Sequence, residues 1–254
     1  MLKLTKYEFR KNLTAPLIML IVIGIMEIVF LCSLALGAET YVGLSFGLQT
    51  TILMFSYLIV LIFSITSYSS ELKSKSSYMT FMAPVSTYKV IGAKLLTALI
   101  MAVIFGATMF IVFPTNIMLI GAKYEGIKSV FNLIKYVIES IGYNFTELLA
   151  MFVTTVLELM VIFYLVVVLA YLSITLSSTV LQDKKFKGFV SAIIFFIIFA
   201  ICMWIDGILP TLIDEPVGYF EAFVAILPSY LFFVACIVGG FFATGKILKE
   251  KVSL

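Results

Sequence analysis

Histidine is absent from the sequence, and charged side chains make up only 12% of it. Without an imidazole the chain cannot form a zinc site of the His-Glu-x-x-His kind, a Ser-His-Asp triad or a histidine proton relay. The stretch closest to an ATP-binding P-loop, Gly240 to Lys246, lacks the hydroxyl that should follow the lysine and lies in an apolar segment. We therefore expect no catalytic site, no ATPase site and no bound cofactor.

Cysteine is also scarce, and its placement excludes disulfide frameworks and metal clusters. Cys32, Cys202 and Cys236 all lie in apolar runs without paired or metal-ligand spacing, so they are interpreted as small hydrophobic residues. Hydrophobic residues, in contrast, make up 63% of the chain, and its mean hydropathy is +1.18. These values lie outside the range of soluble globular domains and indicate a membrane protein.

Long apolar segments set the predicted architecture. A spanning helix needs roughly 20 apolar residues, because each residue rises about 1.5 Å through roughly 30 Å of hydrocarbon. Pro16 suits the first turn of the first span, Pro114 predicts a kink in the third, and Pro228 interrupts the sixth. Ala235 and Gly239 form a spacing that permits close helix packing. The sequence predicts one all-α transmembrane domain over residues 1–254, with spans at 17–37, 48–68, 95–120, 148–174, 189–209 and 222–245.

Positive charge in the connecting segments predicts the orientation of these spans. Lys and Arg are retained preferentially in short loops on the cytoplasmic side. Most of them fall in alternate segments: Lys3, Lys6, Arg10, Lys11, Lys73, Lys75, Lys89, Lys94, Lys184, Lys185, Lys187, Lys246, Lys249 and Lys251. The opposite side carries Lys123, Lys128 and Lys135 with Glu39, Glu125, Glu139, Asp214, Glu215 and Glu221. Both termini are therefore predicted to be cytoplasmic.

The N-terminal segment, residues 1–15, has the pattern of an interfacial amphipathic helix. Lys3, Lys6 and Arg10 recur at helical spacing. Apolar side chains gather on the other face: Leu2, Phe9 and Leu13. A plain basic flank that orients the first span explains the same charges.

A second amphipathic stretch lies in the predicted outer loop, residues 122–146. Its apolar residues repeat at i, i+3, i+4 and i+7. They are Ile127, Val130, Phe131, Ile134, Val137, Ile138 and Ile141, with Lys128, Lys135 and Glu139 elsewhere on the wheel. This segment is predicted to lie on the outer membrane surface or to cap the helices.

Three carboxylates inside the predicted spans are candidates for a translocation path: Glu27, Glu158 and Asp206. A charge near the bilayer centre costs at least about 2.5 kcal/mol, and no Lys or Arg lies at comparable depth to pair with Glu27 or Glu158. Each must be protonated, bonded to a hydroxyl such as that of Tyr164, or facing water. Either they line a polar path suited to cationic or amphipathic cargo, or they are neutral acids that join helices.

The cytoplasmic loop from Glu71 to Lys94 is the most informative soluble stretch. Its composition suggests a short docking helix, a turn at Ala83-Pro84, and a helix start capped by Ser86 or Thr87. This loop resembles the one between the second and third spans of ABC-2 type transporter permeases. The residues that carry the resemblance are Glu71, Met82, Pro84, Val85, Ser86, Gly92 and Lys94.

Other parts of the chain are similar to that family as well. They include the basic N-terminal helix, a Ser-rich turn over Leu176 to Gly188, and a Pro-containing outer segment over Ile208 to Pro228, which often forms short re-entrant helices in the family. This sequence departs from the pattern where Ser74 or Ser76 replaces a usual glycine, and in its enlarged outer loop.

The resemblance implies a bacterial plasma-membrane permease subunit of an ATP-driven exporter. It implies pairing with a second permease, identical or related, and with separate ATP-binding subunits, in contact with membrane lipid and without nucleic acid. The candidate residues for coupling to the ATPase are Glu71, Lys73, Lys75, Tyr78, Met82 and Pro84. Two other classes stay open: a proton-coupled secondary transporter using Glu27 and Glu158, and a membrane sensor or structural subunit.

Overall fold

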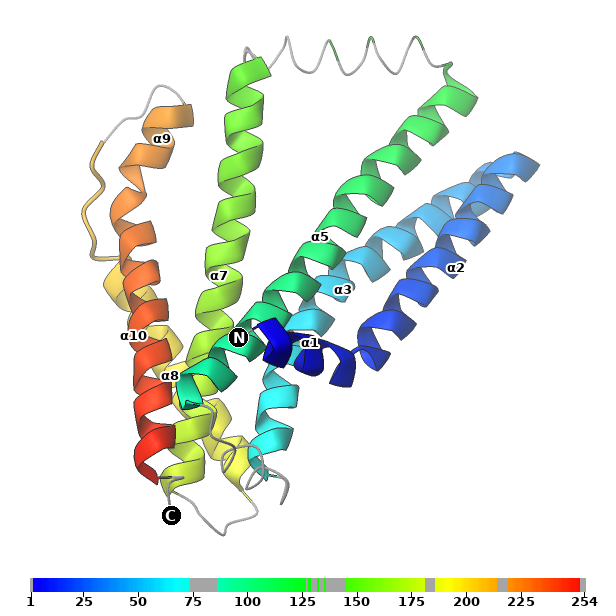
Figure 1. Ribbon diagram of the computed structural model, residues 1–254. Coiled ribbons are helices and arrows are strands. Elements are labelled where there is room, and N and C mark those ends of the chain that lie inside the picture. The colour runs from blue at the N-terminus through cyan, green and yellow to red at the C-terminus, as the bar shows by residue number, and fades with distance from the viewer. Residues whose placement is uncertain are drawn as a thin grey trace. The chain divides into compact units, whose positions relative to one another are not determined.

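The computed structural model describes residues 2–73, 86–126, 128, 132, 135, 145–180, 186–213 and 219–251. Within these residues every regular element is an α-helix (Figure 1). The helices are α1 (Leu2–Lys11), α2 (Thr14–Leu36), α3 (Glu39–Lys73), α5 (Thr87–Tyr124), α7 (Phe145–Val180), α8 (Lys187–Asp206), α9 (Tyr219–Ala225) and α10 (Leu227–Lys251).

Six of these helices are long and apolar enough to cross a membrane, with mean hydropathies from 2.0 to 2.8. Their ranges are Thr14–Leu36, Glu39–Leu72, Thr87–Tyr124, Leu149–Thr179, Lys187–Asp206 and Leu227–Glu250. Within the described residues the predicted all-α class is confirmed, as is the presence of six helices that could span a membrane, and these indicate a multi-pass membrane protein. The cytoplasmic placement of the termini stays a prediction.

Several helices extend beyond the predicted ends of their spans. The third spanning helix begins at Thr87 instead of Leu95, and the fourth continues to Val180. The predicted Ser-rich turn is therefore wrong where it overlaps α7, since Ser177 and Ser178 are helical. Their hydroxyls donate to the carbonyl oxygens of Lys187 (2.7 Å) and Thr175 (2.8 Å). Serine is compatible with a helix end when its hydroxyl finds such an acceptor.

Proline has different consequences in the third and sixth spans. The predicted sixth span, 222–245, divides at Ile226 into α9 and α10, and Pro228 occupies the second position of α10, where a missing N–H costs nothing. Pro114, in contrast, lies inside α5, which continues unbroken to Tyr124.

The chain forms two compact units. Unit 1 contains residues 64–95 and 144–254, and unit 2 contains residues 2–63 and 96–143. In unit 1, α7 packs against α8 and α10 (Figure 1). Its centre is a buried cluster of Leu165, Leu169 and Cys202 covered by aromatic side chains, which confirms a packing role for Cys202.

A bare glycine permits the close approach of α10 to α7. A Cβ atom at Gly240 would lie 2.7 Å from Cγ1 of Val168. The predicted packing pair makes no close contact among the described residues, because Ala235 and Gly239 are both exposed, and a Cβ at Gly239 would meet nothing within 4 Å. The contact therefore lies one residue further along the chain, on the neighbouring face of the helix.

Unit 2 contains the hairpin of α2 and α3. Gly37 ends α2 with a positive φ of 71°, and its N–H donates to the carbonyl of Leu34 at 3.1 Å. The Lys123 ammonium also donates to the Leu34 carbonyl and, at 3.2 Å, to that of Ala35. Because carbonyls at a helix C-terminus carry partial negative charge, this lysine stabilises the end of α2. This contact gives a structural role to Lys123, one of the few basic residues on the predicted outer side.

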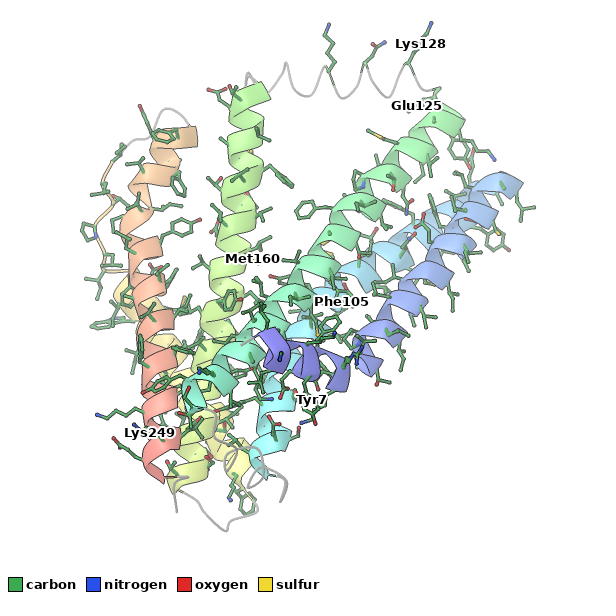
Figure 2. The ribbon with its side chains drawn as sticks, in the orientation of Figure 1. Tyr7, Phe105, Glu125, Lys128, Met160 and Lys249 are labelled. Carbon is green, nitrogen blue, oxygen red and sulfur yellow. The ribbon has the colours of Figure 1, made fainter. Side chains whose placement is uncertain are left out.

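The two predicted amphipathic segments have different outcomes. A helix, α1, is present at residues 2–11, where Thr5 and Glu8 are buried while Leu2 and Tyr7 are 79% and 64% exposed. Figure 2 shows the position of Tyr7 on this helix. The position of α1 on a membrane surface stays a prediction. Within residues 127–141 of the outer segment the structure describes only Lys128, Asn132 and Lys135, all exposed.

We expect the substitution Gly240→Ala to lower the stability of the protein by about 1–3 kcal/mol, because the added methyl group forces α10 away from Val168. Thermal unfolding in detergent measures this as a lower midpoint. Gly239→Ala is the matched control, since its methyl group enters open space. Equal midpoints for the two variants would contradict close packing at Gly240.

Candidate functional site

The two flanks of the predicted coupling loop are joined by a buried ion pair. Glu71 lies in the last turn of α3 and Lys94 lies in the first part of α5, both within unit 1. The Lys94 ammonium contacts the Glu71 carboxylate, and each side chain is only 5% exposed. These are the acid and the lysine that begin and end the sequence resemblance, so the pair closes the base of the loop.

A pair of tyrosines fixes the end of α3 to α7. The rings of Tyr68 and Tyr171 stack with centroids 4.1 Å apart and an interplanar angle of 18°. The Tyr68 hydroxyl lies 2.6 Å from the hydroxyl of Thr175, and the Tyr171 hydroxyl donates to the carbonyl of Ser64 at 3.3 Å. Both rings are 2% exposed, so this flank of the loop is anchored in the core of unit 1.

The second flank, the start of α5, is anchored to α10. The Thr87 hydroxyl donates to the carbonyl of Gly245 at 3.3 Å, and the Tyr88 ring lies against Gly245, where a Cβ atom would collide with it. Phe241 and Phe242 lie with their ring centroids 6.1 Å and 6.0 Å from that of Tyr88. Because both flanks are held, a force on the loop would reach the spanning helices directly.

The predicted coupling residues themselves are only partly described. Four of them lie outside the described residues: Lys75, Tyr78, Met82 and Pro84. The backbone of Lys73 ends α3, but its side chain is not described. The carboxylate of Glu71 is buried against its own chain, so its position indicates that it supports the loop. Sequence reasoning missed the pairing with Lys94, although two opposite charges at the ends of one loop were a usable signal.

Glu158 and Asp206 line one pocket of about 180 Å³ in unit 1. Glu158 belongs to α7, Asp206 is the last residue of α8, and Ser229 and Tyr230 complete the polar lining from α10. Oδ1 of Asp206 is buried and has no hydrogen-bond partner within the described part of the chain. The Tyr164 hydroxyl, which was expected to bond to Glu158, instead donates to the carbonyl of Leu95 at 3.3 Å.

Glu27 lies in unit 2, where it forms a cluster with two amide side chains from neighbouring helices. Its Oε2 accepts hydrogen bonds from Nε2 of Gln49 and, at 3.2 Å, from Nδ2 of Asn116. Nδ2 of Asn116 also donates to Oε1 of Gln49 at 3.1 Å. Gln49 and Asn116 are each 1% exposed. The cluster therefore joins α2, α3 and α5.

The amide partners of Glu27 were missed at the sequence level because only Lys, Arg and hydroxyl groups were considered as partners. An amide N–H stabilises a buried carboxyl oxygen without bringing a charge into the apolar region. Gln49 and Asn116 both lie in long apolar segments, and this placement was the signal that pointed to them. The arrangement fits a carboxyl group that joins helices.

No family model, no curated protein and no solved structure matches this chain. Among the described residues, no group of three or more Cys, Asp or Glu side chains could hold a metal ion. Any assignment of function therefore depends on the residues of the chain itself.

We expect Lys94→Met to destabilise the protein by about 3–5 kcal/mol, because it leaves the Glu71 carboxylate buried without its counter-charge. Adding Glu71→Gln should recover most of the loss, as measured by chemical unfolding in detergent. Lys246→Met is the control, because the Lys246–Glu250 pair is exposed and such pairs contribute about 0–1 kcal/mol. A loss for Lys246→Met as large as for Lys94→Met would refute the importance of the buried pair.

We expect Glu27→Leu to destabilise the protein by about 1–3 kcal/mol, because it leaves the amide groups of Gln49 and Asn116 without their shared acceptor. Glu27→Gln retains an acceptor oxygen and should cost less. The comparison is Glu158→Leu, at an exposed carboxyl that makes no hydrogen bond within the described residues. If Glu158→Leu shifts the unfolding midpoint as far as Glu27→Leu does, the cluster has no special structural role.

Proposed function

We propose that this chain is the membrane-spanning permease subunit of an ATP-driven ABC exporter, working with separate ATP-binding subunits and a second permease. The observation that carries the proposal is the buried Glu71–Lys94 pair. The resemblance to ABC-2 type permeases singled out these two residues at the two ends of the loop that would dock on the ATPase. Their burial and contact provide a physical reason for that pattern.

The anchored flanks suit the mechanical role that such a subunit would have. A two-state rigid-body switch requires an element that passes a movement on without deforming. On one side Tyr68 and Tyr171 fix α3 to α7, and on the other Thr87 fixes α5 to α10. Movement of a loop held in this way would tilt α3 and α5 together. The N-terminal helix α1 would form the membrane-surface part of the same lever.

The cargo we propose is an antimicrobial or amphipathic peptide, or another hydrophobic compound. Glu158, Asp206 and Glu27 are the path candidates, and the first two line a shared pocket. A carboxyl pair in a pocket that Lys and Arg do not line would attract a cationic group. The proposed location is a bacterial plasma membrane.

The same pocket favours a second candidate, a proton-coupled secondary transporter. Two carboxyls that line one small cavity could share and exchange a proton. Transport by the chain alone, driven by a proton gradient and abolished by Glu158→Gln, would support this candidate. Transport that requires ATP and a co-purifying ATPase would support the first.

We expect an ATP-binding subunit to co-purify with the detergent-solubilised chain from its native membrane. A Tyr78→Ala, Met82→Ala double variant should lose it or uncouple its ATPase activity, because both changes fall in the loop while the buried pair at its base remains intact. The control is Lys246→Ala, which changes a side chain that is 73% exposed.

An unchanged yield and activity in the loop variant would show that the partner docks elsewhere. If no ATPase elutes with the wild-type chain after mild extraction, the exporter proposal fails. The carboxyl pocket then becomes the place to test for proton coupling.

A further inference from the structure

A second pocket of unit 1, separate from the carboxyl pocket, lies between α3, α7 and α8 and has a volume of about 280 Å³. One end of it lies at the start of α8, where Lys187 and Gly188 line it together with Ser177 and Ser178 from the end of α7. The other end is lined by Phe195, two turns further along α8, with Ile65 and Ala170. The side chains that α7 and α8 contribute therefore change from polar to apolar along the pocket, while α3 contributes Thr66, Ser69 and Leu72 along its length.

The polar end of this pocket begins at an uncapped helix. The N-cap residue of α8 is Phe186, which makes no side-chain cap hydrogen bond. The first N–H groups of a helix have no intrahelical acceptor, and together with the helix dipole they favour an anion. Gly188 adds no side chain that could cover them, and Lys187 adds a positive charge at the same end. This 20-residue helix thus presents a site suited to a phosphate group.

Ser191 is an independent indication that the pocket holds a ligand. It lies in the first turns of α8, lines the pocket and is 9% exposed. Within the part of the chain that the structure describes, its hydroxyl makes no hydrogen bond. The carbonyl that a helical serine in this position usually bonds, that of Lys187, already accepts from Ser177. The Ser191 hydroxyl is therefore left to donate to a group inside the pocket.

We propose that this pocket binds an anionic phospholipid, with the phosphate at the start of α8 and the first part of an acyl chain along Ile174 and Phe195. An amphiphile matches the polar-to-apolar lining, and a soluble anion would use only one end of it. The start of a spanning helix is also the level at which a headgroup lies, and basic pockets between spanning helices are suited to anionic headgroups. The proposal does not depend on the proposed transport function.

The test is the unfolding temperature of the purified full-length chain in neutral detergent during titration with phosphatidylglycerol, phosphatidylcholine or inorganic phosphate. We expect saturable stabilisation by phosphatidylglycerol and none by the other two. Lys187→Gln should weaken the apparent affinity about fivefold, the factor that corresponds to one basic residue near an anionic lipid surface. Ser191→Ala should weaken it as well, each variant being compared with its own lipid-free baseline.

The control is Lys246→Gln, which removes the same charge from an exposed site on α10 and should leave the affinity unchanged. The proposal is overturned if phosphatidylglycerol does not stabilise the wild type, or if Lys246→Gln weakens binding as much as Lys187→Gln. It is also overturned if both pocket variants bind like the wild type. Equal stabilisation by inorganic phosphate would identify a soluble phosphate ligand in place of the lipid.

Discussion

The lack of water inside a bilayer is the constraint on which the rest of this structure depends. A polar group on a spanning helix must find its partner within the protein, since the hydrocarbon supplies none. The chain meets this requirement by pairing polar side chains across helices. The hydroxyl oxygens of Ser33 and Ser45 lie 2.9 Å apart, and those of Tyr68 and Thr175 lie 2.6 Å apart. The Glu27 carboxyl accepts hydrogen bonds from the side-chain amides of Gln49 and Asn116. These pairs determine which helices of each unit can lie together.

The same constraint explains why the base of the predicted coupling loop is so strongly held. Glu71 and Lys94 are too buried to be solvated separately, and their mutual contact offsets part of the cost of losing water. The tyrosine stack beside them adds apolar contact and leaves both hydroxyls bonded. A rigid base of this kind is useful only if the segment that it supports receives a force or a partner. This is the reason that the proposed function is centred here.

Polar groups that lack a hydrogen-bond partner within the described residues are informative because they indicate where a ligand could supply one. In the described residues, the buried Oδ1 of Asp206 and the hydroxyl of Ser191, a residue that is 9% exposed, both lack hydrogen bonds. Both residues line pockets: Asp206 lines one together with Glu158, and Ser191 lines the other together with Lys187. Two pockets with different polar linings thus lie in the same unit, at opposite ends of α8.

The sequence by itself determined that the chain is helical and has six segments long and apolar enough to cross a membrane, because length and apolar composition decide whether a segment partitions into a bilayer. It also identified the carboxylates as unusual, because the cost of burying a charge depends on residue type. Only the tertiary structure decided what each one contacts. Gln49 and Asn116 meet Glu27 across three helices, Lys94 meets Glu71 across a loop, and the close glycine is Gly240 and not Gly239. These contacts depend on the rotation and depth at which helices pack, and an apolar segment with little amphipathic patterning leaves both of these unspecified.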